Sequence, residues 1–144
     1  MILVSACLAG IKCAWDGKGR EKENIKALVA QGKAIPVCPE VLAGRAIPRE
    51  RTEIEDGDGE GVIKGAKKVY EETGKDVTGE FLKGAYLTLD IIKTYKIKEA
   101  ILKSKSPSCG VGRVYDGSFK GGLVKGDGVT TALLKKEGVL CRDI

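Results

Sequence analysis

The sequence predicts a small α/β fold built on a doubly wound, mainly parallel sheet. Short apolar runs at residues 2–4, 34–37 and 99–102 are continuous rather than alternating, which is typical of strands buried on both faces of a parallel sheet. Stretches with helical periodicity separate these runs, and this alternation favours right-handed crossover connections. Because 144 residues suit one hydrophobic core, we expect a single domain spanning residues 1–144.

The first part of the chain supplies two strands and a crossover helix. Residues 2–4 run into the small residues Ser5 and Ala6, as expected where a buried strand enters a loop. Residues 21–31 carry apolar side chains at i, i+3 and i+4, and a glycine then provides a natural helix stop. Residues 34–37 follow as the second predicted strand.

The segment 44–76 is expected to form a β-hairpin or an irregular insertion. Its EDGDGEG sequence is an acidic, glycine-rich turn between possible strands near residues 53–54 and 62–63. Such an insertion is a candidate lid for a site on the main sheet.

A long helix is predicted after this insertion. Thr78 can cap it, and it ends near Tyr95. Its buried face is predicted from apolar residues at helical spacing, namely Phe81, Ala85, Leu89 and Ile92. Beyond the strand at 99–102, residues 129–136 form the last predicted helix and residues 139–140 a possible edge strand.

A cysteine follows each of the predicted parallel strands. Cys7 comes after the first strand, Cys38 after the second, and Cys109, in the loop SKSPSCG, after the third. Doubly wound folds bind ligands beyond the carboxyl ends of their strands, so we expect these thiols to share one crevice. Each alone could be an ordinary buried residue, but converging thiolates suit a soft metal or an iron–sulfur cluster with one iron open to substrate.

Any metal chemistry must proceed without histidine, because the chain contains none. A zinc site normally has a fourth nitrogen or sulfur ligand, and no C-x-x-C pair indicates a zinc ribbon or a thioredoxin-like dithiol. Cys13 could be a further ligand or a resolving thiol, although a structural role is commoner for such a residue. Cys141, in the last predicted strand, is interpreted as a packing residue.

Two polar side chains are candidates for acid–base work and substrate contact. Glu40, which follows Cys38 closely, is expected at the floor of the crevice, where it could act as a general base or simply favour a helix dipole. Ser108 directly precedes Cys109 in a loop stiffened by proline. That loop could present hydroxyl and amide groups to a ligand, or it could be an ordinary polar turn.

Charge and hydropathy limit the expected partners. The net charge of +5 comes from 25 basic and 20 acidic residues spread along the chain, so no clustered basic patch indicates specific nucleic-acid binding. No apolar run is long enough to cross a bilayer and no signal-peptide pattern opens the chain, so we expect a cytoplasmic protein without a membrane partner. The five cysteines, an odd number, suit free thiols in a reducing cytosol. The sequence leaves the oligomeric state open.

Several motifs together resemble a known family. They are SACLAG with CAWDG, PVCPEV, GKDVT before a long helix, ILKSKSPSCGVGRVYDGSF, and GDGVTTALL, and they cover nearly the whole chain. In this combination the chain resembles the domain-of-unknown-function family that contains the thiouracil desulfurases. The resemblance implies a 4Fe-4S cluster held by Cys7, Cys38 and Cys109, with the fourth iron free to take sulfur.

The resemblance also implies a reaction. In such enzymes water attacks the thiocarbonyl carbon of a thiolated pyrimidine, and sulfur leaves to the cluster without net oxidation or reduction. Glu40 is implied as the group that activates water or moves protons, and Ser108 as a hydroxyl that orients the substrate. The chain is therefore expected to be a cluster-dependent desulfurase acting on a thiouracil-like pyrimidine or a related small thioamide.

Two other functions remain open at the level of sequence. The same cysteines could hold a cluster or zinc in a non-catalytic metal or sulfur carrier. Alternatively, the glycine-rich stretch 110–128 could belong to a small-ligand-binding regulatory domain, although it matches neither the dinucleotide fingerprint nor the P-loop. Loss of desulfuration in a Glu40→Ala protein that keeps its metal would reject the carrier.

Overall fold

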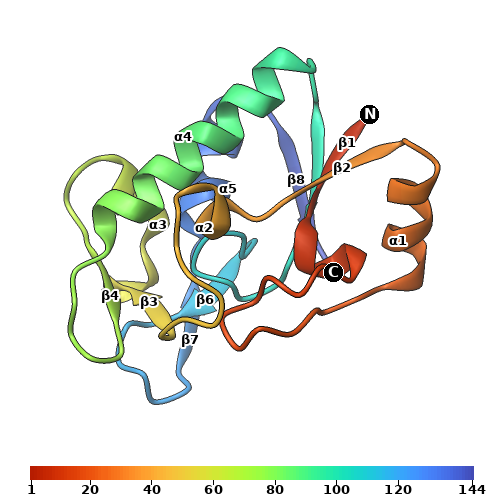
Figure 1. The fold of residues 1–144 in the computed structure, drawn as a ribbon. Helices are drawn as coiled ribbons and strands as arrows, with labels where there is room; N and C mark the ends of the chain where they lie inside the picture. Colours follow the sequence, from red (N-terminus) through yellow and green to blue (C-terminus); the bar gives the residue numbers. More distant parts are fainter.

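A computed structural model describes residues 1–144, and its centre is a four-stranded parallel sheet in the order β2-β1-β5-β8 (Figure 1). The strands are β1 (Ile2–Ser5), β2 (Ala34–Val37), β5 (Glu99–Leu102) and β8 (Leu140–Asp143). The connecting helices are α1 (Glu23–Ala30), α4 (Thr78–Thr94) and α5 (Val129–Lys136). The predicted strand-helix alternation and the doubly wound, mainly parallel fold are confirmed.

The sheet separates two apolar layers. Leu3 and Leu102 belong to the larger cluster, which includes the buried faces of α4 and α5, whereas Val4 and Ile101 belong to the smaller cluster with Ile25 of α1. This division follows because successive side chains of a strand point to opposite faces. Burial on both faces explains why the apolar runs are continuous in the sequence.

Helix α4 buries the predicted face but begins differently from the prediction. The buried apolar residues of this face are Phe81, Ala85, Leu89 and Ile92. Thr78 is the first helical residue, Val77 is the N-cap, and no side chain makes an N-cap hydrogen bond. Instead, Asp76 Oδ1 accepts hydrogen bonds from the Thr78 N–H at 2.9 Å and from the Thr78 hydroxyl at 2.6 Å. The predicted threonine cap is therefore wrong, because Asp76 engages that hydroxyl before the helix starts.

The insertion at 44–76 contains a hairpin, but its second strand is not where it was predicted. The paired strands are β3 (Thr52–Ile54) and β4 (Val69–Glu71), which run antiparallel. Residues 62–63, expected as a strand, lie in the short helix α3 (Gly59–Ile63). The carboxylate of Asp58 accepts the Gly61 N–H at 2.8 Å and caps this helix, so the acidic, glycine-rich segment starts a helix rather than closing a hairpin.

Smaller elements gather at the carboxyl end of the sheet. They are η1 (Ala6–Ala9) after β1, α2 (Pro39–Leu42) after β2, η2 (Glu55–Gly57) after β3, and the hairpin of β6 (Arg113–Tyr115) with β7 (Leu123–Lys125). The sequence indicates only a glycine-rich loop where this last hairpin forms. In Figure 1 both hairpins lie below the parallel sheet, at the end where its strands finish. These elements form the surroundings of the site.

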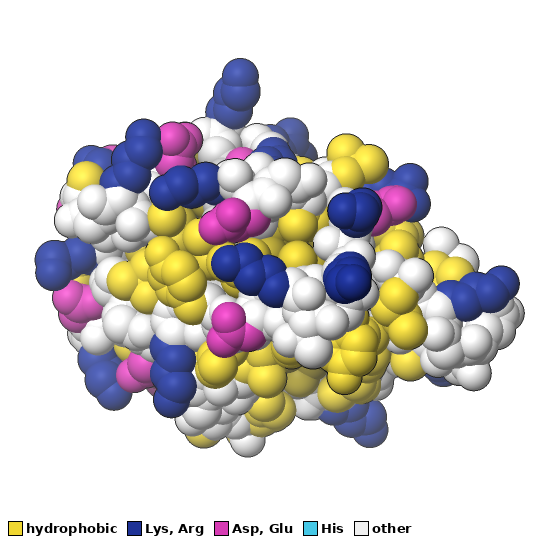
Figure 2. Space-filling view, turned by 90° about the horizontal axis from the view of Figure 1, so that it is seen from above, with side chains coloured by type: hydrophobic (Ala, Val, Ile, Leu, Met, Phe, Trp, Pro, Cys, Tyr) yellow, Lys and Arg dark blue, Asp and Glu magenta, His cyan; other side chains and the backbone are white.

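The face of the molecule seen from above carries mixed charge. Figure 2 shows Lys and Arg interspersed with Asp and Glu across this face, with hydrophobic side chains exposed between them.

Among the helices, including α4, none combines the length and the apolar character required to cross a membrane.

Candidate active site

A pocket lies where the doubly wound fold predicts a site. Its volume is about 400 Å³, and its walls come from the segments that follow β1, β2 and β5. Strand β1 pairs with β2 on one side and with β5 on the other, so these strand ends are neighbours across the switch point of the sheet. Cys7, Cys38 and Cys109 all line the pocket, together with Glu40 and Ser108.

Cys7 and Cys38 are positioned by short helical turns that follow their strands. Cys7 lies in η1, and its carbonyl accepts hydrogen bonds from the Gly10 N–H at 3.1 Å and the Arg20 N–H at 2.8 Å. Cys38 is the N-cap residue of α2, in extended conformation, with Pro39 as the first helical residue. Proline suits this position because the missing N–H would have no helical partner there.

The loop that carries Ser108 and Cys109 is fixed from two sides. Ser106 Oγ accepts the N–H groups of Ser108 at 3.2 Å and Cys109 at 3.1 Å. From the other side, the first N–H groups of α5 bond the carbonyls of this loop, and Thr131 Oγ1 donates to the Cys109 carbonyl at 2.9 Å. Gly128 packs against the backbone of Ser108, where any Cβ would overlap it. The helix N-terminus thus holds the cysteine loop rigidly over the sheet.

The thiols differ in their ease of ionisation. A hydrogen bond with Cys13 lowers the pKa of Cys38 to about 7, and the Arg49 cation acts in the same direction. Burial raises the pKa of Cys109 to about 12. Burial also raises the pKa of Cys7, with a contribution from nearby Cys38. Cys38 is therefore the thiol of the three that ionises most easily.

The placement of the three thiols around one pocket suits a cluster. No group of three or more His, Cys, Asp or Glu side chains converges to hold a single ion. The three thiols instead surround the pocket, and in an iron–sulfur cluster each thiolate binds its own iron, so the ligands are spread around the group. The cations of Lys103 and Arg20 lie close enough to Cys7 to favour its thiolate, and would offset the negative charge of a thiolate-bound cluster.

Glu40 and Ser108 meet inside this pocket. The Ser108 hydroxyl donates to Glu40 Oε2 at 3.0 Å and lies 3.8 Å from Cys109 Sγ. Both side chains are nearly buried, at 9% and 3% exposure for Glu40 and Ser108 respectively. The structure thus brings the two predicted polar residues into direct contact, although they are 68 positions apart in the sequence.

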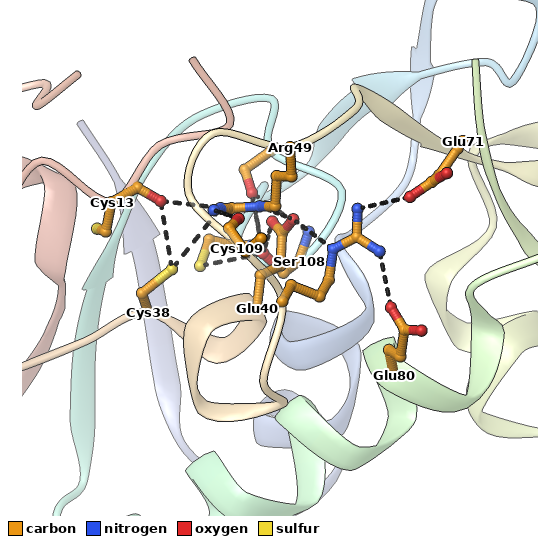
Figure 3. A network of polar contacts seen from close by, with 11 residues as sticks. Cys13, Cys38, Glu40, Arg49, Glu71, Glu80, Ser108 and Cys109 are labelled. Carbon is orange, nitrogen blue, oxygen red and sulfur yellow. Dashed lines mark hydrogen bonds and ion pairs between the residues drawn. The ribbon is translucent and has the colours of Figure 1, made fainter. Parts of the chain in front are cut away.

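Two arginines that the sequence did not single out hold Glu40 in place (Figure 3). Arg49 Nε donates to Glu40 Oε1 at 3.1 Å, and its Nη2 donates to the Cys13 carbonyl at 2.9 Å and lies 4.0 Å from Cys38 Sγ. Arg45 lies 3.8 Å from Glu40 Oε1 and pairs with Glu71 and Glu80, at 3.3 and 2.8 Å. Both guanidinium groups come from the irregular segment before β3, where no sequence pattern indicates an inward-facing charge.

The remaining cysteines lie at different distances from the site. Cys13 is 3% exposed and lines the pocket, and its carbonyl is within 3.9 Å of Cys38 Sγ. Cys141 lies in β8, packs against the larger apolar cluster and is not part of the pocket. A packing role suits Cys141, whereas Cys13 belongs to the surroundings of Cys38.

The pocket combines soft ligands with a carboxylate and a hydroxyl. Three thiols at its wall can hold an electrophilic metal group, and a fixed carboxylate beside a hydroxyl can accept a proton and orient a small substrate. Five basic residues and two carboxylates line the pocket, so its charged groups are mainly cationic. Such a site suits hydrolytic chemistry on a small, polar molecule.

Comparisons with known proteins point in the same direction. A family model described as 2-thiouracil desulfurase matches residues 2–143. The Bacillus subtilis (strain 168) protein "Uncharacterized protein YbbK" is 46% identical over 138 residues, which cover 96% of this chain and 91% of that protein. A solved structure titled "[4Fe-4S]-dependent thiouracil desulfidase TudS" superposes with a TM-score of 0.87 at 40% identity, over 99% of this chain and 89% of that one.

Proposed function

Because this chain belongs to the 2-thiouracil desulfurase family, we propose that it is a 4Fe-4S-dependent desulfurase of thiouracil-like pyrimidines or related small thioamides. In the overall reaction water replaces sulfur: the C=S bond is broken, a C=O bond forms, and hydrogen sulfide is released without net oxidation or reduction. All five cysteines are unpaired, which supports a reducing, cytosolic location for the enzyme.

Cys7, Cys38 and Cys109 are the residues that would hold the cluster. They come from three strand ends around one pocket, and a set of three thiolates leaves one iron without a protein ligand. When bound, the cluster supplies a Lewis-acidic iron at which a thiocarbonyl sulfur can be polarised. The other steps depend on side chains of this chain.

Glu40 serves as the general base in this proposal, and Ser108 as the group that orients the substrate. Arg49 occupies Glu40 Oε1, so Oε2 is the oxygen directed to Ser108 and is the atom that takes the proton from the attacking water. The Ser108 hydroxyl can turn from Glu40 to a substrate heteroatom, because it both donates and accepts. Burial of the pair keeps bulk water from competing with the substrate.

The observation that carries this proposal is the contact between Glu40 and Ser108 next to Cys109. A carboxylate from one segment meets a hydroxyl and a thiol from another: Ser108 Oγ lies 3.0 Å from Glu40 Oε2 and 3.8 Å from Cys109 Sγ. A protein that only stored or delivered metal would need the thiols but not a fixed carboxylate aimed at them. The geometry therefore favours catalysis over a carrier.

A Glu40→Gln substitution tests the proposal. The amide has nearly the same shape but cannot accept a proton, so we expect kcat for 2-thiouracil to fall about 10²- to 10⁴-fold. The iron content and the visible absorbance of the anaerobically reconstituted protein should stay at wild-type values. Release of uracil and sulfide measures the turnover.

Glu60→Gln is the matched control. Glu60 is exposed on α3 and pairs only with Lys64, at 2.8 Å, so its variant should turn over like the wild type. A Glu40→Gln enzyme with full turnover would reject the base assignment. A wild-type protein that binds its cluster but does not desulfurate would favour the carrier instead.

A further inference from the structure

Glu53 is a carboxylate in the pocket wall that the proposed chemistry does not use. It lies in β3, is 7% exposed and lines the pocket. One oxygen, Oε1, accepts the backbone N–H groups of Gly117 at 2.9 Å and Phe119 at 3.1 Å. The other oxygen, Oε2, has no hydrogen-bond partner, and Glu53 makes no ion pair. A nearly buried carboxylate is thus anchored through one oxygen only.

Glu40 is the only other carboxylate in the pocket, and it is fully engaged. Its Oε1 accepts from Arg49 and its Oε2 from Ser108. The other charged side chains of the pocket belong to five basic residues, all of them donors. Glu53 Oε2 is therefore the one carboxylate oxygen of the pocket that has no hydrogen-bond partner. A ligand bound in the pocket would cover this oxygen, so a ligand that donates a hydrogen bond to it avoids burying an unpartnered acceptor and gains affinity and specificity.

A cyclic thioamide carries the donor that such an acceptor requires. Its thiocarbonyl sulfur is an acceptor, and each N–H beside that carbon is a donor that must be satisfied when the ring is buried. We propose that Glu53 is a specificity-determining residue that accepts a ring N–H adjacent to the thiocarbonyl group. This inference rests on the proposed desulfurase function and names its substrate class: thioamides with a free N–H next to the C=S carbon.

The position of Glu53 suits recognition rather than chemistry. Its backbone belongs to the β3 hairpin, and its bonds to Gly117 and Phe119 tie that hairpin to the turn between β6 and β7. Two rigid hairpins thus set the direction of the carboxylate, whereas Glu40 and the cysteines lie on the parallel sheet side. Substrate choice and sulfur removal are assigned to separate structural units.

A Glu53→Gln substitution replaces the free acceptor with a donor and keeps the hydrogen bonds to Gly117 and Phe119. The glutamine amide oxygen can still accept the N–H groups of Gly117 and Phe119, which leaves its NH₂ group, a donor, at the place of Oε2. For 2-thiouracil we expect kcat/KM to fall about 10- to 100-fold, mostly through KM, because a charge-assisted hydrogen bond is lost. Iron content and melting temperature should remain those of the wild type.

Methylated substrates give a second test, which starts from the wild-type enzyme. The wild-type enzyme should discriminate by a similar factor against 1-methyl- or 3-methyl-2-thiouracil, whichever lacks the N–H that Glu53 accepts. The Glu53→Gln enzyme should lose that discrimination. Calorimetric binding of uracil, the product, gives a readout independent of turnover: the variant should bind it correspondingly more weakly.

Several outcomes would overturn the inference. The first is equal turnover of 2-thiouracil and both methylated substrates by the wild type. The second is unchanged uracil binding in Glu53→Gln. The third is an equal loss of turnover by the variant on every substrate, because an equal loss would indicate a structural role for Glu53. A wild-type enzyme that holds its cluster but converts none of these compounds would reject the proposed function itself. Failure of the Glu53 inference and failure of the proposed desulfurase function are therefore distinguishable.

Discussion

Cys38 is the residue at which the electrostatics of the site are most evident. It adjoins the Cys13 thiol and the Arg49 guanidinium, and its pKa is lowered to about 7, whereas burial raises the pKa of Cys109 to about 12. The thiolate, not the thiol, is both nucleophile and metal ligand. Cys38 therefore has the lowest pKa of the three thiols.

This difference predicts the order of chemical modification in cluster-free protein. At pH 7.5 iodoacetamide should alkylate Cys38 before Cys7 and Cys109, and the Cys38 rate should rise with pH through a midpoint near 7 as the thiolate forms. Mass spectrometry of peptides from timed samples measures each rate. Preferential labelling of Cys109 would contradict the arrangement, and reconstituted protein should be protected at all three positions.

At the level of single residues the sequence was informative only where a strand positioned the residue. Cys7, Cys38 and Cys109 could be brought together because each follows a predicted parallel strand, and such strand ends meet at one edge. Arg49 could not, because it lies in an irregular segment whose path depends on tertiary contacts, and Glu53 could not, because β3 pairs only with β4, outside the parallel sheet. Their charges look like ordinary surface charges in the sequence.

Among the elements, the contact between α2 and α4 positions the cysteine and carboxylate of the CPE motif. Gly84 of α4 faces the Pro39 carbonyl oxygen so closely that a Cβ would overlap it. The absence of a side chain lets α2 rest directly on α4. The glycine in this otherwise regular helix thus has a packing reason.

A pair of alanine substitutions tests this contact. Alanine is the better helix former, so Gly79→Ala, with open space around it, should be neutral or stabilising by up to about 1 kcal/mol. Gly84→Ala should instead be destabilising by about 1–3 kcal/mol, because α2 must move. Urea unfolding at a fixed pH measures both free energies. Equal effects of the two substitutions would show that α2 does not press on α4.

The elements themselves were predictable where local pattern and tertiary burial agree. The strands at 34–37 and 99–102 and the helix at 129–136 have the predicted bounds, because their apolar residues are those the core buries. The second strand of the insertion was misplaced, because the Asp58 cap starts a helix in a segment read as a turn. The β6–β7 hairpin has short strands and many glycines, which give little local signal.

For the whole molecule, the topology accounts for the location of the site. The sheet order β2-β1-β5-β8 places the ends of β1, β2 and β5 side by side, and residues of β3 and β6 complete the lining of the pocket. The parallel sheet supplies the thiols and the Glu40–Ser108 pair, while the β3 hairpin supplies Glu53. One fold thus joins a cluster site to a substrate-recognition wall.

The most direct test of the cluster-dependent account is anaerobic reconstitution with iron and sulfide, followed by iron counting and 2-thiouracil turnover. The comparison includes the wild type, Cys7→Ser, Cys38→Ser and Cys109→Ser, with Cys141→Ser, outside the pocket, as the control. We expect about four irons per chain and turnover in the wild type and the control, and loss of both in each pocket variant. Full iron content and turnover in all three pocket variants would contradict the account.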